Sequence, residues 1–320
     1  MAQMKNYNQN SGFQAQANSS SFDILKTQAK IVSERYGDFH LADLGCSHGR
    51  NSMECVKAAF DGYTGNPSSI RVYLNDLPTN DFGEVFKCLN DPVISYHHHP
   101  LARQSSISTY VNGQDFYTQC LPDDHVHLSF SYNCLHWLST TIPLSRALFA
   151  SSERVTAEEA EVLAKSAHEH LLSFLTSRSK ELKHGGRLVL VFVKGGTGIS
   201  YFEDLWEAYV KSTAIELESL AGVVVPTYNR TDAEVQLVLD NVQDKFKTIT
   251  KTSFRHEHGR FTLESMKSVI FNAMVNSLAT TGVFKTRSEC EEYIDGFFLS
   301  ASTDPPSHII DFHTLVLEKL

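Results

Sequence analysis

The sequence predicts an α/β fold, with a mostly parallel sheet and a helical cap, from three observations. Short apolar segments alternate with helical patterns as far as Val193, the order expected when helices cover a parallel sheet. A turn punctuated by Gly45 and Gly49 follows the first apolar segment and leads into a helical pattern. After Gly195 the pattern becomes mainly helical, which indicates a cap over the ligand-binding edge of the sheet.

The elements before the cap follow from apolar spacing. An apolar spacing of three and four after Ser19-Ser20-Ser21 predicts a first helix that Gly37 ends. Alternating or fully apolar segments predict strands at about 39–44, 70–75, 107–111, 125–132 and 187–193. The same criteria predict helices through Met53 to Phe60, at 81–90 and at 155–183, the last stopped by Gly185-Gly186.

The cap is expected to hold helices near 201–220, 231–241, 261–281 and 288–300, followed by a strand at 309–318 that closes the sheet. This divides the chain into an N-terminal segment (1–20), a ligand-binding sheet domain (21–198), the cap (199–308) and the returning strand (309–320). The apolar residues of the cap suit either a lipophilic ligand or an ordinary core: Phe202, Trp206, Leu220, Val224, Phe297 and Phe298.

Composition excludes several classes of protein. With 320 residues, 42% of them hydrophobic, the chain can bury a full core, and a net charge of −9 argues against a nucleic-acid-binding surface. No apolar stretch is long enough to span a membrane, and the N-terminus has no apolar segment of the secretory type, so we expect a cytoplasmic protein.

The six cysteines show no C-x-x-C spacing and are expected to be free thiols. The run from His97 to His99 is expected to be a solvated loop, and no metal site is predicted.

The stretch Leu41 to Asn51 combines a strand, an acid and the glycine turn. A dinucleotide fingerprint would need glycines where Ser47 and Arg50 stand, so that motif is absent. Asp43 at the strand end cannot favour a pyrophosphate, but it suits a cationic ligand such as S-adenosylmethionine, whose sulfonium and ammonium are both positive. A tight turn without a ligand remains the alternative.

Two further strand ends carry candidate ligand-binding groups. Asp76 ends the second strand, where an acid can accept both hydroxyls of a ribose, although an acid before Pro78 is as often a turn former. His136 and Trp137 follow the central strand. They are either core residues or N–H donors above an active-site crevice.

Several stretches together resemble the SABATH family of S-adenosylmethionine-dependent carboxyl methyltransferases, named for salicylic acid, benzoic acid and theobromine enzymes. No single motif carries the resemblance, which depends on the order and spacing of all of them. The similar stretches are Tyr7-x-x-Asn10-Ser11-x-x-Gln14, Asp43-Leu44-Gly45-Cys46-Ser47-x-Gly49-x-Asn51, Leu74-Asn75-Asp76-Leu77-Pro78-x-Asn80-Asp81-Phe82, Leu135-His136-Trp137-Leu138-Ser139, Gly185-Gly186-Arg187-Leu188-Val189-Leu190, Leu205-Trp206 and Pro226-x-Tyr228 with Glu234.

The resemblance implies a Rossmann-like class I methyltransferase sheet, S-adenosylmethionine as cofactor and a set of site residues. Donor contacts are implied at Ser11, Asp43, Gly45 and Asn51 for the methionine end, at Asp76 and Leu77 for the ribose, and at Asp115 and Phe116 for the adenine. The side-chain N–H groups of Gln14 and Trp137 are implied to bind the substrate carboxylate. His136, Asn133 and Trp206 are implied to lie in the substrate pocket. The N-terminus then becomes an active-site strap, and a homodimer is implied.

The chain departs from the family pattern at several points. The block Gly113-Gln114-Asp115-Phe116-Tyr117 is one residue longer than the family's Gly-Ser-Phe-Tyr and has Asp for Ser, while Asn133 stands where the family has a tyrosine. A lysine before the first block and a C-terminal Arg-Ala signature have no counterpart here. These departures indicate a distant, non-plant branch and leave the acceptor open.

A carboxylate acceptor needs no general base, because carboxylic acids with a pKa near ~4 are already ionised at neutral pH. The resemblance therefore implies a methyl ester as the product, and the apolar residues of the cap indicate a small lipophilic carboxylic acid, for example a fatty, terpenoid or aromatic acid, as the acceptor. A nitrogen or hydroxyl acceptor, with His136 as base, is the first alternative. A catalytically silent protein that binds a small acid is the second.

Overall fold

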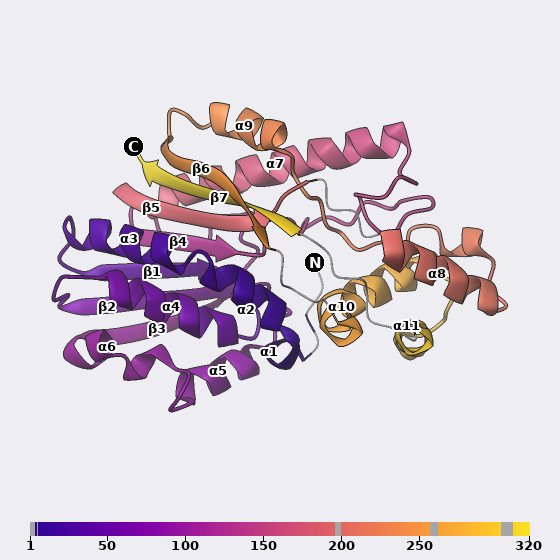
Figure 1. Ribbon diagram of the computed structural model, residues 1–320, viewed down its shortest axis with the longest axis horizontal. Coiled ribbons are helices and arrows are strands. Elements are labelled where there is room, and N and C mark those ends of the chain that lie inside the picture. The colour runs from indigo at the N-terminus through magenta and orange to yellow at the C-terminus, as the bar shows by residue number, and fades with distance from the viewer. Residues whose placement is uncertain (1–3, 5, 196–199, 257–261, 302–309) are drawn as a thin grey trace.

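The computed structural model describes residues 4, 6–195, 200–256, 262–301 and 310–320. In these residues a seven-stranded mixed sheet has the order β3-β2-β1-β4-β5-β7-β6 (Figure 1). β7 alone runs antiparallel to its neighbours. The predicted α/β fold is confirmed. The strands are β1 (Phe39–Leu44), β2 (Ser69–Asp76), β3 (Ser106–Gly113), β4 (Val126–Tyr132), β5 (Leu182–Val193), β6 (Phe246–His256) and β7 (Ile310–Lys319).

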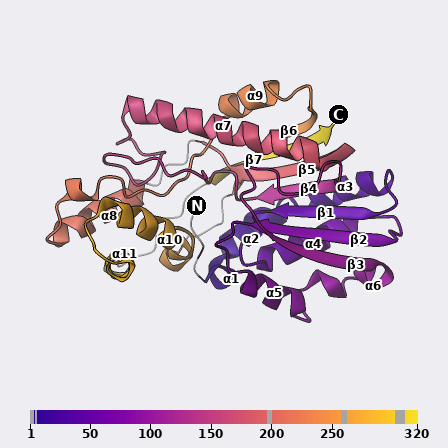
Figure 2. The ribbon, with the colours of Figure 1, turned by 180° about the vertical axis from the view of Figure 1, so that it is seen from behind.

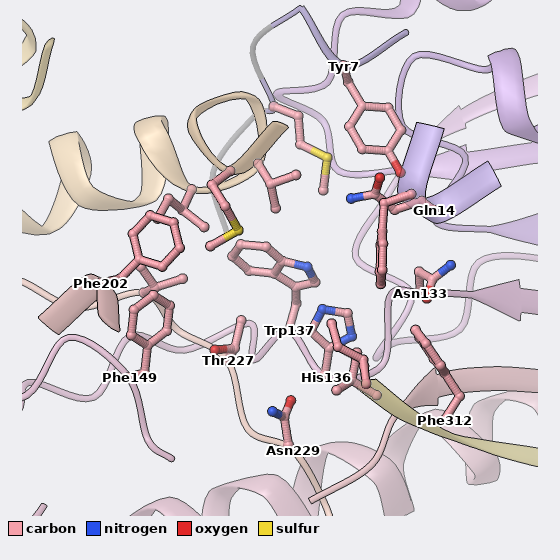
Figure 3. A pocket seen from close by; sticks show the side chains of 18 residues that line it. Tyr7, Gln14, Asn133, His136, Trp137, Phe149, Phe202, Thr227, Asn229 and Phe312 are labelled. Carbon is pink, nitrogen blue, oxygen red and sulfur yellow. The ribbon is translucent and has the colours of Figure 1, made fainter. Parts of the chain in front are cut away.

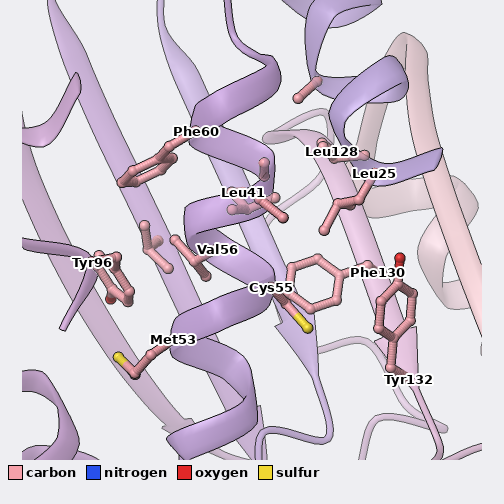
Figure 4. Close-up of a cluster of buried hydrophobic side chains, with 14 of the residues drawn as sticks. Leu25, Leu41, Met53, Cys55, Val56, Phe60, Tyr96, Leu128, Phe130 and Tyr132 are labelled. Atoms are coloured by element: carbon pink, nitrogen blue, oxygen red, sulfur yellow. The ribbon is translucent and has the colours of Figure 1, made fainter. Parts of the chain in front are cut away.

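Helices cover both faces of the sheet, and a separate apolar core lies on each face. On one face α3 (Phe22–Ser33) and α4 (Arg50–Gly62) pack on the central strands, where Leu25, Val56 and Phe60 meet Leu41 and Phe130 (Figure 4). On the other face lie α7 (Ala157–Glu181) and α9 (Asp232–Asp240). The outer part of the first face carries α5 (Phe82–Asn90), η1 (Tyr96–His98) and α6 (Pro100–Gln104).

The cap helices gather beyond the carboxyl ends of the parallel strands, as the two opposite views show (Figures 1 and 2). They are α8 (Ser200–Ser212), η2 (Leu217–Leu220), α10 (Leu263–Thr281) and α11 (Arg287–Ser300). The single helix predicted at 201–220 is wrong, since α8 ends at Ser212. The cap has its own core, in which Trp206 packs edge-on against Tyr293 and Phe297.

Two predictions at the sheet need correction. β6 was not predicted because it is an edge strand that pairs only with β7 and carries mostly polar, exposed residues. The helix predicted to end at Lys183 ends at Glu181, and Gly185 lies inside β5 with a positive φ of 77°. A Cβ there would overlap the Arg35 guanidinium at 1.3 Å, so this glycine makes room for a side chain instead of ending a helix.

The N-terminal segment is helical, and hydrogen bonds join it to both the sheet domain and the cap. It forms α1 (Tyr7–Asn10) and α2 (Gly12–Ser19). Asn8 accepts the N–H of Arg50 (3.1 Å), the first residue of α4, and Ser265 of α10 donates to the carbonyl of Asn10 (2.9 Å). The segment therefore bridges the sheet domain and the cap. The predicted division at residues 20, 198 and 308 stays a prediction, and the last two positions lie outside the described residues.

The three consecutive histidines do not form a solvated loop. His97 is half-buried, and its Nε2 lies 2.9 Å from the hydroxyl of Thr109. His99 Nε2 lies 3.0 Å from a carboxylate oxygen of Asp61. The rings of His97 and His99 thus each have a partner because η1 and α6 pack against the sheet, whereas His98 is exposed.

Candidate active site

The loop after β1 is shaped by a glycine. The N–H groups of Gly45 and Cys46 both donate to the carbonyl of Asn75 (2.8 and 3.0 Å), which ties the loop to the end of β2. Gly45 has a φ of 103°, and a Cβ would lie 2.3 Å from Cys134 Sγ. Glycine is thus required here because the φ is positive and because a Cβ would collide with Cys134. Close approach of a ligand is not the only reason for it.

Asp43 is a buried carboxyl at the end of β1. Its side chain is hydrogen-bonded by Ser52, and it lines a small cavity of about 20 Å³ together with Gly45, Asn51 and Tyr7. Burial raises the pKa of Asp43 to about 7, against the lowering effect of Ser52. No cationic side chain of the described residues contributes to this shift, so a positively charged ligand would find an unpaired acid here.

Asp76 is the second carboxyl of this edge; the residue is half-buried, and its carboxyl is shielded from water. It accepts the N–H of Ser47 (2.7 Å) and that of Leu77 (2.8 Å), and burial still raises its pKa to about 6. It lines an adjoining cavity of about 50 Å³, which Leu77 and Phe116 also line. Two buried acids without a basic partner in the described chain fit a cationic donor with an attached ribose, as S-adenosylmethionine has.

Two residues expected at the donor site are not among those that line these cavities. Asp115 lines none of these cavities; its carboxylate accepts the N–H of Tyr117 (2.9 Å) and holds the turn that places Phe116. Ser11 is buried at the junction of α1 and α2 and is also not in the lining of the described cavities. A role of either residue at the donor stays a prediction.

A third cavity, of about 110 Å³, adjoins the donor cavities on the side of the cap (Figure 3). Met4, Tyr7, Asn133 and Trp137 line both this cavity and the one at Asp76, so the two spaces meet at these residues. The apolar part of the lining consists of Met4, Phe13, Phe149, Val193, Phe202, Val225, Met266, Val269, Ile270, Ile310 and Phe312, and the polar part of Tyr7, Gln14, Asn133, His136, Trp137, Thr227 and Asn229.

Gln14 and Trp137 offer N–H groups to this cavity. Both side chains are buried. The side-chain oxygen of Gln14 has no hydrogen-bond partner within the described chain, and the structure gives no hydrogen bond there for the amide nitrogen of Gln14 or the indole N–H of Trp137. Their nitrogen atoms point into the same space (Figure 3). The backbone of Trp137 is fixed, since its N–H donates to Cys134 (2.9 Å) and its carbonyl accepts from the Tyr117 hydroxyl (2.6 Å). Two rigidly placed neutral donors can orient an anion.

His136 is a neutral imidazole at the same wall. Burial lowers its pKa to about 3, and the positive charge of Arg230 adds to the effect. Arg230 is itself fully buried and donates to the carbonyls of Leu135 and Ala167. A histidine with such a low pKa is a weak base at neutral pH.

Asn133 lies where the donor and acceptor cavities meet. Its φ of 58° is in the left-handed region that asparagine tolerates, and its side-chain nitrogen donates to Asn18 (2.6 Å). Trp206, by contrast, is not in the lining of the acceptor cavity, because it is packed into the core of the cap. Phe202, one turn earlier on α8, lines the acceptor cavity where Trp206 was expected.

Sequence reasoning missed three polar lining residues of the acceptor cavity. Tyr7 lines all three cavities, and it was noted only as the start of a motif. Thr227 and Asn229 line the acceptor cavity from the segment before α9. The only sequence signal near them was the motif Pro226-x-Tyr228.

Neither a metal site nor a membrane-spanning helix is found among the residues that the structure describes. These residues contain no group of three or more His, Cys, Asp or Glu side chains arranged to hold a metal ion. Their helices include none with the length and apolar character needed to cross a bilayer.

Known proteins resemble this chain in sequence and in structure. Residues 2–289 match the family model described as SAM dependent carboxyl methyltransferase. Methyltransferase FUS9 of Gibberella fujikuroi is 26% identical over 250 residues (75% of this chain, 67% of the relative), and indole-3-acetate O-methyltransferase 1 of Arabidopsis thaliana is 29% identical over 237 residues (63% and 60%).

The solved structure of a loganic acid methyltransferase with SAH has the same fold. Its TM-score is 0.73 at 17% identity, and the match covers 100% of this chain and 98% of that one. The fold is thus that of class I methyltransferases. The family match over most of the chain confirms the resemblance seen in the motifs: the protein belongs to the SABATH family of S-adenosylmethionine-dependent carboxyl methyltransferases, with S-adenosylmethionine as its methyl donor.

Proposed function

We propose that the enzyme forms the methyl ester of a small lipophilic acid with one carboxylate, which Gln14 and Trp137 bind. The observation that carries this proposal is the pair of unpartnered neutral N–H donors in an otherwise mainly apolar cavity. No Lys, Arg, Asp or Glu belongs to the described lining, so the apolar body of the acid meets apolar side chains.

The protein's part in the reaction is to hold the methyl donor and the acceptor acid and to orient them. S-adenosylmethionine, when bound, supplies an electrophilic methyl group on a sulfonium. Asp43 and Asp76 supply negative charge for the donor's cationic end and its ribose. Gln14 and Trp137 orient the acceptor carboxylate without neutralising it as an arginine would, which leaves its oxygen nucleophilic. Orientation and exclusion of water then account for the rate gain.

The low pKa of His136 argues against an acceptor that must lose a proton. A hydroxyl or ring nitrogen would need a base, and an imidazole with a pKa of about 3 removes such a proton poorly. A carboxylate is already ionised at neutral pH. The names of the relatives include both kinds of acceptor: the Arabidopsis protein is an indole-3-acetate O-methyltransferase, which agrees with this choice, whereas a Camellia sinensis relative is a 3,7-dimethylxanthine N-methyltransferase.

The test is methyl transfer to a panel of fatty, terpenoid, indole and benzoic acids, read by mass spectrometry as the gain of one CH₂. Gln14→Ala and Trp137→Phe should each lower kcat/KM for the best acid by about 10- to 100-fold, because each removes one hydrogen bond to a charged group. Gln16→Ala is the matched control, since Gln16 is exposed on the same helix. Turnover of nitrogen or hydroxyl acceptors alone, or full activity of Gln14→Ala, would contradict the proposal.

The homodimer implied by the resemblance stays a prediction. Sedimentation equilibrium of the purified protein tests it directly.

A further inference from the structure

The segment Val225 to Arg230 forms a fixed wall of the acceptor cavity. Its backbone is bonded to three separate parts of the chain. Val225 donates to Leu148 (2.8 Å), Tyr228 donates to His136 (2.7 Å), and the carbonyl of Arg230 accepts from Gly195 (2.8 Å). Thr227 also forms a β-bridge with Trp137. The segment therefore has the rigidity of a strand, although it belongs to no sheet.

Side chains of this wall alternate between two sides, as in a strand. Val225, Thr227 and Asn229 line the acceptor cavity. Tyr228 and Arg230 face the opposite way and line a groove between α7 and α9. Because the backbone is fixed, the three odd-numbered side chains are held toward the cavity.

Two of these three side chains are polar and have no partner. The structure gives no hydrogen bond for the Thr227 hydroxyl or the Asn229 amide to any other described residue, although both are half-buried. Polar groups in a mainly apolar cavity are normally satisfied by protein, water or ligand. They lie on one side of the Trp137 indole, and Gln14 lies on the other (Figure 3).

We propose that the acceptor acid carries a second polar group, a neutral hydroxyl or carbonyl, and that Thr227 and Asn229 recognise it. The proposal rests on the proposed function, because it takes the carboxylate to be held at Gln14 and Trp137. A hydroxyl and an amide each donate and accept, so the pair suits either a hydroxyl or a carbonyl oxygen. The group lies on the side of the Trp137 indole opposite to Gln14 (Figure 3).

A second carboxylate does not fit this position. The described lining contains no cationic side chain, and the nearest buried cation, Arg230, is held by the carbonyls of Leu135 and Ala167. The carboxylate at Gln14 and Trp137 would meet the positive sulfonium of the donor. A second anion at Thr227 and Asn229 would lose its hydration without an opposite charge in return. The substrate class is thus a lipophilic monocarboxylic acid with a hydroxyl or keto group.

The test uses cyclohexylacetic acid, its 4-oxo and 4-hydroxy derivatives and the 4-carboxy derivative. Ester formation gives kcat/KM, and calorimetry with S-adenosylhomocysteine present gives the dissociation constant of each acid. Thr227→Val and Asn229→Leu remove the two polar groups at nearly constant volume. Tyr228→Phe is the control on the same segment, since its hydroxyl bonds to Glu234 on the other side (2.5 Å).

We expect the wild type to prefer the oxo or hydroxy acid about 10-fold over cyclohexylacetic acid, the value of about one hydrogen bond. The preference should vanish in Thr227→Val or Asn229→Leu and persist in Tyr228→Phe, while the 4-carboxy acid binds most weakly. Esters formed without any preference, or a preference that both variants keep, overturn the inference but not the proposed function. Preferential binding without esterification overturns the proposed reaction alone, and an absence of both binding and ester overturns both.

Discussion

Donor binding should depend on pH, because the two acids of the donor site are buried and unpaired. Burial raises the pKa of Asp43 to about 7 in the donor-free protein. A titration with this pKa leaves roughly ten elevenths of the carboxyl ionised at pH 8 and about one eleventh at pH 6. The donor's positive charge needs the ionised form, so its affinity should fall about tenfold from pH 8 to pH 6. Asp76, with a pKa of about 6, steepens the loss below that pH.

The same burial should make Asp43 costly for stability. The pKa of Asp43 in the folded protein lies above the ordinary value of 3.8. The neutral carboxyl therefore contributes its full stability below about pH 4, and this contribution is lost as the pH rises through 7. A shift of about 3 units corresponds to on the order of 4 kcal/mol at pH 8. Asp43→Asn removes the charge and should stabilise the donor-free protein at pH 8 by up to this amount, while donor affinity is lost.

Calorimetric titration with S-adenosylhomocysteine at pH 6, 7 and 8 and urea unfolding of wild type and Asp43→Asn measure both effects. Asp23→Asn, which removes an exposed acid at the start of α3, is the control for loss of charge. A dissociation constant that does not change between pH 6 and 8 would refute the reasoning. So would an Asp43→Asn protein that is less stable than wild type at pH 8 and still binds the donor fully.

Three further predictions concern the scaffold of the site. Burial lowers the pKa of His127 to about 3, below the unfolded value near 6.5, so its contribution to stability is present above about pH 6.5 and falls by up to ~1.4 kcal/mol per pH unit below it. His127→Asn should flatten the fall of the unfolding free energy between pH 7 and 5, and an unchanged slope would contradict this. Gly45→Ala should abolish donor binding in calorimetry, and adding Cys134→Ala should not restore it, because the φ of 103° disfavours any Cβ. Arg178→Met should lower the unfolding free energy in urea by about 3–5 kcal/mol, since Glu181 would stay buried without its partner (2.7 Å); a loss below 1 kcal/mol would speak against it.

The donor half of the site was predictable from the sequence, because its signals are local. Strand, acid and glycine turn follow one another between Leu41 and Asn51, and the structure places Asp43, Gly45 and Asn51 around one cavity. Asp76 could be added because parallel strands bring their carboxyl ends to one edge. The motif order also sufficed to predict the family.

Only the tertiary structure decided which residues form the acceptor cavity. Trp137 and Thr227 are far apart in sequence and meet in a single bridge, and no periodic pattern specifies such a pair. Trp206 is packed into the core of the cap although its sequence context resembled a pocket motif, and β6 carries too few apolar side chains for a pattern to predict it. The physical reason is the same in each case. Local sequence specifies backbone conformation and the face that is buried, whereas a cavity is the space left where elements distant in sequence pack incompletely, so its lining depends on the whole fold.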